Sequence, residues 1–198
     1  MKRYLRMIGC GVCVAAFLSL SPALRADDVT DSVEEALKAY KDKDYATAAQ
    51  ALDAAAQLVR QKRGELFKEL LPDAPAGWEA DEATTSAAGA AMFGGGVTAE
   101  RNYTKGDSSV TVKFITDSPI MQGVMMMMGN PMFANADGGK LERIKGQKAI
   151  FKNRDGSGSV NVVVGGALLV QIEASDTSDA DLRKFAESID YAKLAGML

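Results

Sequence analysis

Methionines are the residues of this chain best suited to chemistry, because they crowd into one short segment. Six of the ten methionines fall between positions 121 and 132, at Met121, Met125, Met126, Met127, Met128 and Met132. Thioether sulfur is a soft ligand that suits Cu(I). On a helix Met121, Met125 and Met128 share one side, and Met132 lies one turn beyond Met128. These four are the candidate ligands of a Cu(I) site.

The same spacing is typical of a helix that packs on a core. Methionine also fills irregular gaps in cores and forms adaptable apolar contact surfaces. Core packing is therefore the favoured interpretation of the segment, and a contact surface and a copper site are the alternatives.

Residue types that carry catalysis are scarce. The chain has no histidine, and both of its cysteines, Cys10 and Cys13, lie close to the start. Acid–base catalysis near neutral pH most often uses histidine, and nucleophilic sites mostly pair a serine or cysteine with a base. Paired carboxylates or a Ser–Lys dyad remain open, but no spacing singles one out. The sequence predicts a protein that is not an enzyme and has no cofactor.

Two glycine-rich stretches lack the residues that their chemistry would need. Gly94-Gly95-Gly96 is not followed by the Lys and Ser/Thr of a phosphate-binding loop. The stretch 153–159 resembles a calcium loop, but Val164 stands where the closing glutamate would be. Both stretches are interpreted as turns or connections.

The methionine segment belongs to residues 78–198, where most of the pattern is typical of strands. Alternation of apolar and polar residues predicts strands at 97–103, 110–114, 141–144, 149–152, 160–164 and 168–173. Ser118-Pro119 predicts the start of the methionine helix, Gly165-Gly166 fits a two-residue hairpin loop, and Asp179 begins a closing helix. We expect an α+β fold: an antiparallel sheet of about six strands with helices covering one face.

The start of this part, Pro75-Ala76-Gly77-Trp78, and its closing amphipathic helix are similar to those of small exported α+β domains of the PsbP-like kind. The chain as a whole resembles uncharacterised exported bacterial proteins. The resemblance implies an α+β fold and brings no function with it, since a fold alone does not define one.

Residues 27–71 have helical periodicity, and a linker at 72–77 with two prolines and a glycine separates them from the rest. Ser32 with Glu35 fits a capping box at the start of a short helix. Its apolar stripe is Val33, Ala36, Leu37 and Tyr40. A long second helix carries the stripe Tyr45, Ala48, Ala49, Leu52, Ala55, Ala56, Val59, Leu66 and Leu70. The pattern predicts a helical hairpin.

The turn of this hairpin, Ala39-Tyr40-Lys41-Asp42-Lys43-Asp44-Tyr45, followed by Ala48 and Ala49, resembles that of a tetratricopeptide (TPR) repeat. Lys43 stands where that family usually has glycine, and no second copy follows. Repeats of this kind bury their faces against neighbours, so the resemblance implies that the hairpin packs on the second part, another subunit or a partner. Tyr40, Tyr45, Arg60 and Arg63 are the candidate partner-binding residues.

The first 26 residues read as a signal peptide. Lys2, Arg3 and Arg6 precede an apolar run at 7–20, and a small residue, Ala26, precedes the expected cut. A cut after Ala23 is an alternative. The run is too short to span a membrane, and no later stretch is long and apolar enough. We expect a periplasmic or secreted protein.

Cleavage would remove both cysteines, so packing alone would hold the mature chain together. It would also remove four basic residues and no acidic one, which takes the net charge from −3 to −7. Nucleic-acid binding needs clustered Lys and Arg, so nucleic acid is not an expected partner.

These observations predict an exported, soluble, non-catalytic protein that acts as a protein–protein interaction or accessory module. The expected partner is another exported protein, and homo-oligomerisation is also open. The alternative is a carrier of Cu(I) or a small ligand that uses the methionine helix.

Overall fold

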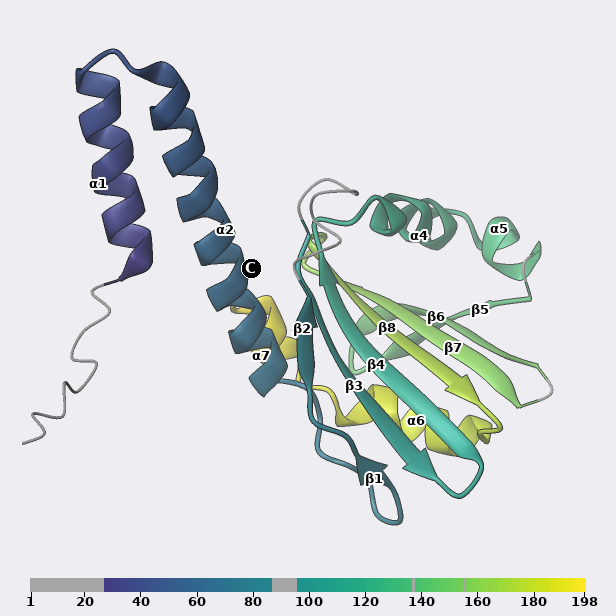
Figure 1. Cartoon of the computed structure of the whole chain (residues 1–198). Helices are drawn as coiled ribbons and strands as arrows, with labels where there is room; N and C mark the ends of the chain where they lie inside the picture. The colour runs from purple at the N-terminus through teal and green to yellow at the C-terminus, as the bar shows by residue number, and fades with distance from the viewer. Residues whose placement is uncertain (1–26, 87–95, 137, 155) are drawn as a thin grey trace, which may run out of the picture.

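The computed structural model describes residues 27–86, 96–136, 138–154 and 156–198. A helical hairpin comes first, and an antiparallel sheet with further helices follows (Figure 1). This arrangement confirms the predicted α+β fold. The expected signal peptide lies outside the described residues.

The hairpin consists of α1 (Asp28–Lys41) and α2 (Tyr45–Glu69). Asp44 caps α2 by accepting hydrogen bonds from the backbone amide and the hydroxyl of Thr47. The predicted capping box at Ser32 is wrong, because α1 already begins at Asp28. The Ser32 hydroxyl instead donates to the Asp28 carbonyl one turn back.

The sheet has eight strands, and every pairing between described strands is antiparallel. Six of them match the predicted ones: β3 (Thr98–Lys105), β4 (Ser108–Thr116), β5 (Lys140–Ile144), β6 (Gln147–Arg154), β7 (Ser157–Val164) and β8 (Leu168–Ser175). Two short strands, β1 (Glu79–Ala80) and β2 (Thr84–Ser86), pair with β3 and were not predicted.

The strand order is β1-β3-β4-β8-β7-β6-β5. After β4 the chain leaves the middle of the sheet through α4 (Pro119–Gly129) and α5 (Pro131–Ala136). It enters the far edge as β5 and returns strand by strand until β8 pairs with β4. Phe114 of β4 lies opposite Val170 of β8 in this central pairing.

Helices pack on both faces of the sheet, so the expectation of one covered face is wrong. On one face α6 (Asp179–Ser188) and α7 (Tyr191–Ala195) cover the main core. On the other face Val124 and Met128 of α4 form a smaller cluster with Ile150 and Leu169. In Figure 1 α6 lies behind the strands and α4 lies above their upper ends.

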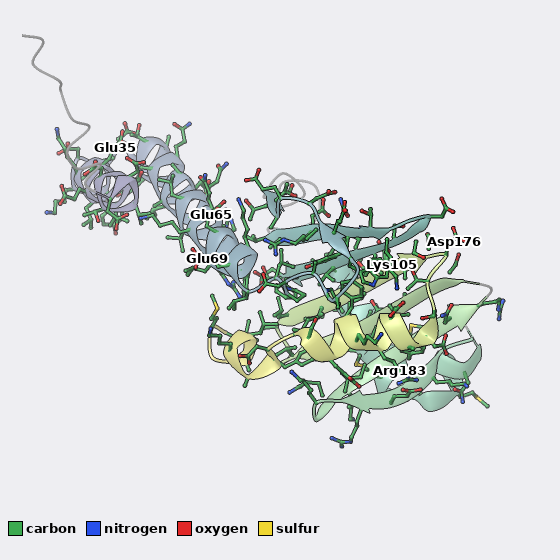
Figure 2. The ribbon with its side chains drawn as sticks, turned by 90° about the horizontal axis from the view of Figure 1, so that it is seen from below. Glu35, Glu65, Glu69, Lys105, Asp176 and Arg183 are labelled. Atoms are coloured by element: carbon green, nitrogen blue, oxygen red, sulfur yellow. The ribbon has the colours of Figure 1, made fainter. Side chains whose placement is uncertain are left out.

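An ion pair and a ring contact hold α6 on strands β5 and β6. The Arg183 guanidinium donates to both Glu142 carboxylate oxygens, at 2.6 and 2.9 Å, and its Cζ lies 4.3 Å from the centroid of the Phe151 ring. The hydrogen bonds from Arg183 lower the pKa of Glu142. Figure 2 shows Arg183 on the α6 ribbon.

The hairpin and the sheet share one hydrophobic core across residues 72–77. Phe67 and Leu71, at the end of α2, belong to the same buried cluster as the sheet and α6. Trp78, just after the linker, packs edge-on against Phe185 of α6 with the ring centroids 4.9 Å apart. The C-terminal end of α2 is therefore fixed in position by side chains from the sheet and from α6.

Among the helices that the structure describes, none combines the length and apolarity that a membrane crossing requires.

Candidate interaction surface

The methionines predicted as copper ligands lie in different environments. Met128 is buried, 8% exposed, against Ile150 and Leu169 of the sheet. Met125 and Met132 are 47% and 74% exposed, and Met121 is half-buried. Met128 therefore belongs to the hydrophobic core, whereas Met125 and Met132 face solvent. The copper role remains a prediction.

Other side chains do not supply a metal site in the part of the chain that the structure describes. No group of three or more Asp or Glu side chains there is arranged to hold a metal ion. In the stretch 153–159, which resembles a calcium loop in sequence, Asn153 and Arg154 end β6 and residues 157–159 begin β7.

Among the residues that the structure describes, the largest collection of exposed apolar side chains lies on the hairpin. We call it the hairpin face, and it consists of Val33, Leu37 and Tyr40 from α1 and Tyr45, Leu52, Val59 and Leu66 from α2. Their exposed fractions run from 37% for Val33 to 64% for Tyr40. Folded chains rarely leave so many large apolar groups contiguous in water unless something else covers them.

A ring contact shows that the two helices contribute to one continuous face. Tyr40, near the end of α1, and Tyr45, at the start of α2, meet edge-on with centroids 5.7 Å apart. At 3.6 residues per turn, the remaining members follow these two tyrosines along the same side of each helix. The face therefore runs from the turn of the hairpin toward the sheet.

The small residues between α1 and α2 explain why the large apolar side chains of the hairpin face remain exposed to solvent. Ala36 and Ala39 of α1 and Ala48, Ala51 and Ala55 of α2 are buried. Helices whose contact positions are alanine approach closely, and this leaves no room for leucine or tyrosine between them. The large residues are therefore displaced to the side of the contact, where they remain exposed.

The α2 members of the hairpin face are spaced seven residues apart, at Tyr45, Leu52, Val59 and Leu66. Seven residues take almost two helical turns, so this spacing forms a nearly straight stripe. Apolar stripes with this repeat are typical of helices that pack along a second helix. The spacing favours a helical occupant for the hairpin face.

The end of α2 near the sheet is held by polar contacts as well as by the shared core. Glu65 accepts a hydrogen bond of 2.9 Å from the Thr85 hydroxyl of β2, and Lys68 lies 3.9 Å from Glu82. Gly64 lets α2 approach β2 and β3, because a Cβ there would lie 2.9 Å from a Val97 methyl. The hairpin that carries the hairpin face is thus held on the sheet at the C-terminal end of α2.

The far end of the hairpin stands clear of the sheet and its helices in both views (Figures 1 and 2). Figure 2 shows Glu35 on this free part, and Glu65 and Glu69 closer to the sheet. A partner can therefore reach the hairpin without displacing the sheet.

The predicted partner-binding residues lie in three different settings. Tyr40 and Tyr45 are members of the hairpin face. Arg63 instead pairs with Asp117 at 3.5 Å and lies over the Phe67 ring at 5.4 Å, so it helps to anchor α2. Arg60 has no ion-pair partner among the described residues.

Apart from Tyr40 and Tyr45, the members of the hairpin face were predicted only as parts of helical stripes. The predicted stripes merged the buried alanines and the exposed large residues into one apolar side. The seven-residue spacing from Tyr45 to Leu66 was the signal that could have separated them.

A second apolar feature lies at the start of α4. A cleft of about 380 Å³ is bounded by the end of β4 and the first turn of α4, with Ile115, Pro119 and Ile120 among its lining residues. It is open to solvent and lies beside the methionine helix.

Comparisons with known proteins add nothing to this picture, since no family model, curated protein or solved structure matches the chain.

Proposed function

We propose that this chain is a non-catalytic protein–protein interaction module that acts after export, and that the hairpin face is its contact surface. The observation that carries the proposal is the set of large apolar side chains left exposed on the helical hairpin. The C-terminal end of α2 in this hairpin is fixed in the core. Burying such groups against a partner is worth about 25 cal/mol per Å². The partner is another exported protein or a second copy of the chain.

Site-specific photo-crosslinking in cells tests the proposal. A photoreactive residue at Leu52, in the hairpin face, should give a covalent adduct with one defined protein chain. The same residue at Gln57, which is exposed on a more polar side of α2, is the matched control and should give none. If Leu52 and Gln57 give the same adducts, or neither gives any, the hairpin face is not a contact surface.

A second candidate function is a carrier that uses the methionine helix. The cleft beside Ile115 and Ile120 favours it, because an apolar ligand could lie there next to α4. Titration of the purified protein with Cu(I) against a competing chelator tests the metal version. Replacing Met121, Met125, Met128 and Met132 by leucine should abolish binding if these sulfurs are the ligands. Unchanged affinity would overturn that version.

A further inference from the structure

We infer that the hairpin face binds the hairpin face of a second copy of this chain, with the two α2 helices antiparallel. The inference rests on the proposed function and names the partner. The symmetry of the stripe on α2, the charges beside the stripe and the exposed area of the hairpin face support it.

The stripe on α2 is compatible with a two-fold axis. Its members are evenly spaced, so an axis that passes midway between Leu52 and Val59 places each of these residues opposite the other in the second copy. The same axis places Leu66 opposite the partner's Tyr45. Two-fold contacts of this kind use the same patch on both copies, which is the commonest arrangement in homo-oligomers.

The charges beside the stripe favour the antiparallel direction. Asp53 and Arg60 are seven residues apart and therefore lie on the same edge of the stripe, on either side of its midpoint. An antiparallel pair brings each Asp53 next to the Arg60 of the other copy. In a parallel pair the same edge of the two helices lies on opposite sides of the contact, so Asp53 would not meet the Arg60 of the other copy.

Both charges are free to make this contact. Neither Asp53 nor Arg60 forms an ion pair or side-chain hydrogen bond with any residue that the structure describes, whereas the neighbouring Lys62 pairs with Asp27 and Arg63 with Asp117. Pairing between two copies would give Asp53 and Arg60 the ion-pair partners that they lack within one chain.

The exposed area matches what a stable dimer requires. The seven members of the hairpin face together expose on the order of 800 Å², which is the area that each partner contributes to a standard protein–protein interface. Their apolar character is the kind of surface that homodimer interfaces bury at their centre.

Charge reversal tests the pairing. Sedimentation velocity of the full chain, purified after export, should show a dimer that Asp53→Arg or Arg60→Asp alone weakens about tenfold or more, since each change sets like charges together. The double variant Asp53→Arg/Arg60→Asp should recover the dimer, because the pairs re-form with their signs exchanged. Gln50→Arg, on another side of α2, is the matched control and should leave the dimer unchanged. Failure of the double variant to recover would overturn the antiparallel pairing.

Cysteine cross-linking tests the direction independently. Residues 27–198 contain no cysteine, and only a residue near the two-fold axis comes within disulfide distance of itself in an antiparallel pair. Ala56→Cys should therefore form a disulfide-linked dimer on oxidation, whereas Ala49→Cys, two turns away on the same side of α2, should not. A parallel pair would link both variants, and that result would overturn the inference.

The outcomes separate this inference from the proposed function. If the chain is monomeric and Leu52 cross-links in cells to a different protein, the inference that the partner is a second copy is overturned. The proposal that the chain is a protein–protein interaction module is then supported. A monomeric chain with no adduct from the hairpin face would overturn both.

Discussion

The phenol of Tyr103 donates a hydrogen bond of 2.6 Å to the carbonyl oxygen of Pro72. This bond joins β3 to Pro72, the first residue of the linker at 72–77. Arg101, two residues before Tyr103, donates to the same oxygen at 3.2 Å. The Pro72 carbonyl thus accepts hydrogen bonds from two residues of one strand. These bonds hold the proline-containing linker on the sheet.

Replacing Tyr103 by phenylalanine should lower the free energy of unfolding by about 1 kcal/mol, the usual net value of a hydrogen bond. The loss stays modest because Arg101 still supplies a donor to Pro72. Urea denaturation followed by circular dichroism measures it. Tyr45→Phe, where the ring is 62% exposed, is the control and should cost almost nothing. Equal losses in the two variants would show that the Pro72 bond contributes nothing.

Stability should fall between about pH 10 and pH 12. Burial raises the pKa of Tyr103 from 10.0 to about 12, and burial also raises the pKa of Tyr191. Above pH 10 the unfolded chain releases these protons while the folded chain keeps them, so rising pH favours unfolding. Denaturation midpoints measured across this range should decline in the wild type. The decline should be shallower in Tyr103→Phe and in Tyr191→Phe, and an unchanged slope in both would contradict the assignment.

Enlarging an alanine between the two hairpin helices should destabilise the hairpin. Ala51 is 6% exposed and faces α1, so Ala51→Leu forces the helices apart at a cost of about 1–3 kcal/mol. Ala54→Leu, at an exposed position one turn along α2, should stay within about 0.5 kcal/mol of the wild type. Thermal melts followed at 222 nm, with hydrogen exchange of α1 amides, make the comparison. Similar melts for the two variants would mean that the alanine contact tolerates a larger residue.

Truncating methionines of α4 should separate the core role from the surface role. Met128→Ala removes a side chain buried against Ile150 and Leu169 and should cost about 2 kcal/mol or more. Met126→Ala alters a side chain that is 69% exposed and should change stability by less than about 0.5 kcal/mol. Guanidinium denaturation of both variants measures the difference. If Met126→Ala costs as much as Met128→Ala, the side of α4 that faces the sheet has been misassigned.

Local patterns predicted most of the fold. Gly165 and Gly166 have positive φ, 58° and 74°, as predicted. The predicted loop length of two residues is wrong, because Val164 pairs with Leu168 and the loop therefore also contains Ala167. Ser118 caps α4 by accepting from the Ile120 amide, and Pro119 occupies the first turn. These features depend only on neighbours in the chain, so the sequence displays them directly.

Features set by distant contacts were missed. Strands β1 and β2 have two and three residues, too few for a periodic pattern, and their pairing with β3 forms them. The second covered face was missed although Leu168-Leu169-Val170 is a continuous apolar run, which is typical of a strand buried on both sides. Which apolar residues of the hairpin stay exposed depends on the closeness of two helices, and no single stripe shows it.

The position of β8 has a consequence for the order in which this protein can assemble. Among the described strands, the β3–β4 hairpin and the β5–β8 meander join where β4 pairs with β8, and Lys113 on one strand meets Glu173 on the other, 60 residues later. Contacts so distant in sequence slow folding, because a long loop must close before they form. Until Ser175 has been synthesised, β4 lacks its second neighbour and the main core lacks its central strand. A nascent chain of this topology therefore completes its sheet only late in its own synthesis.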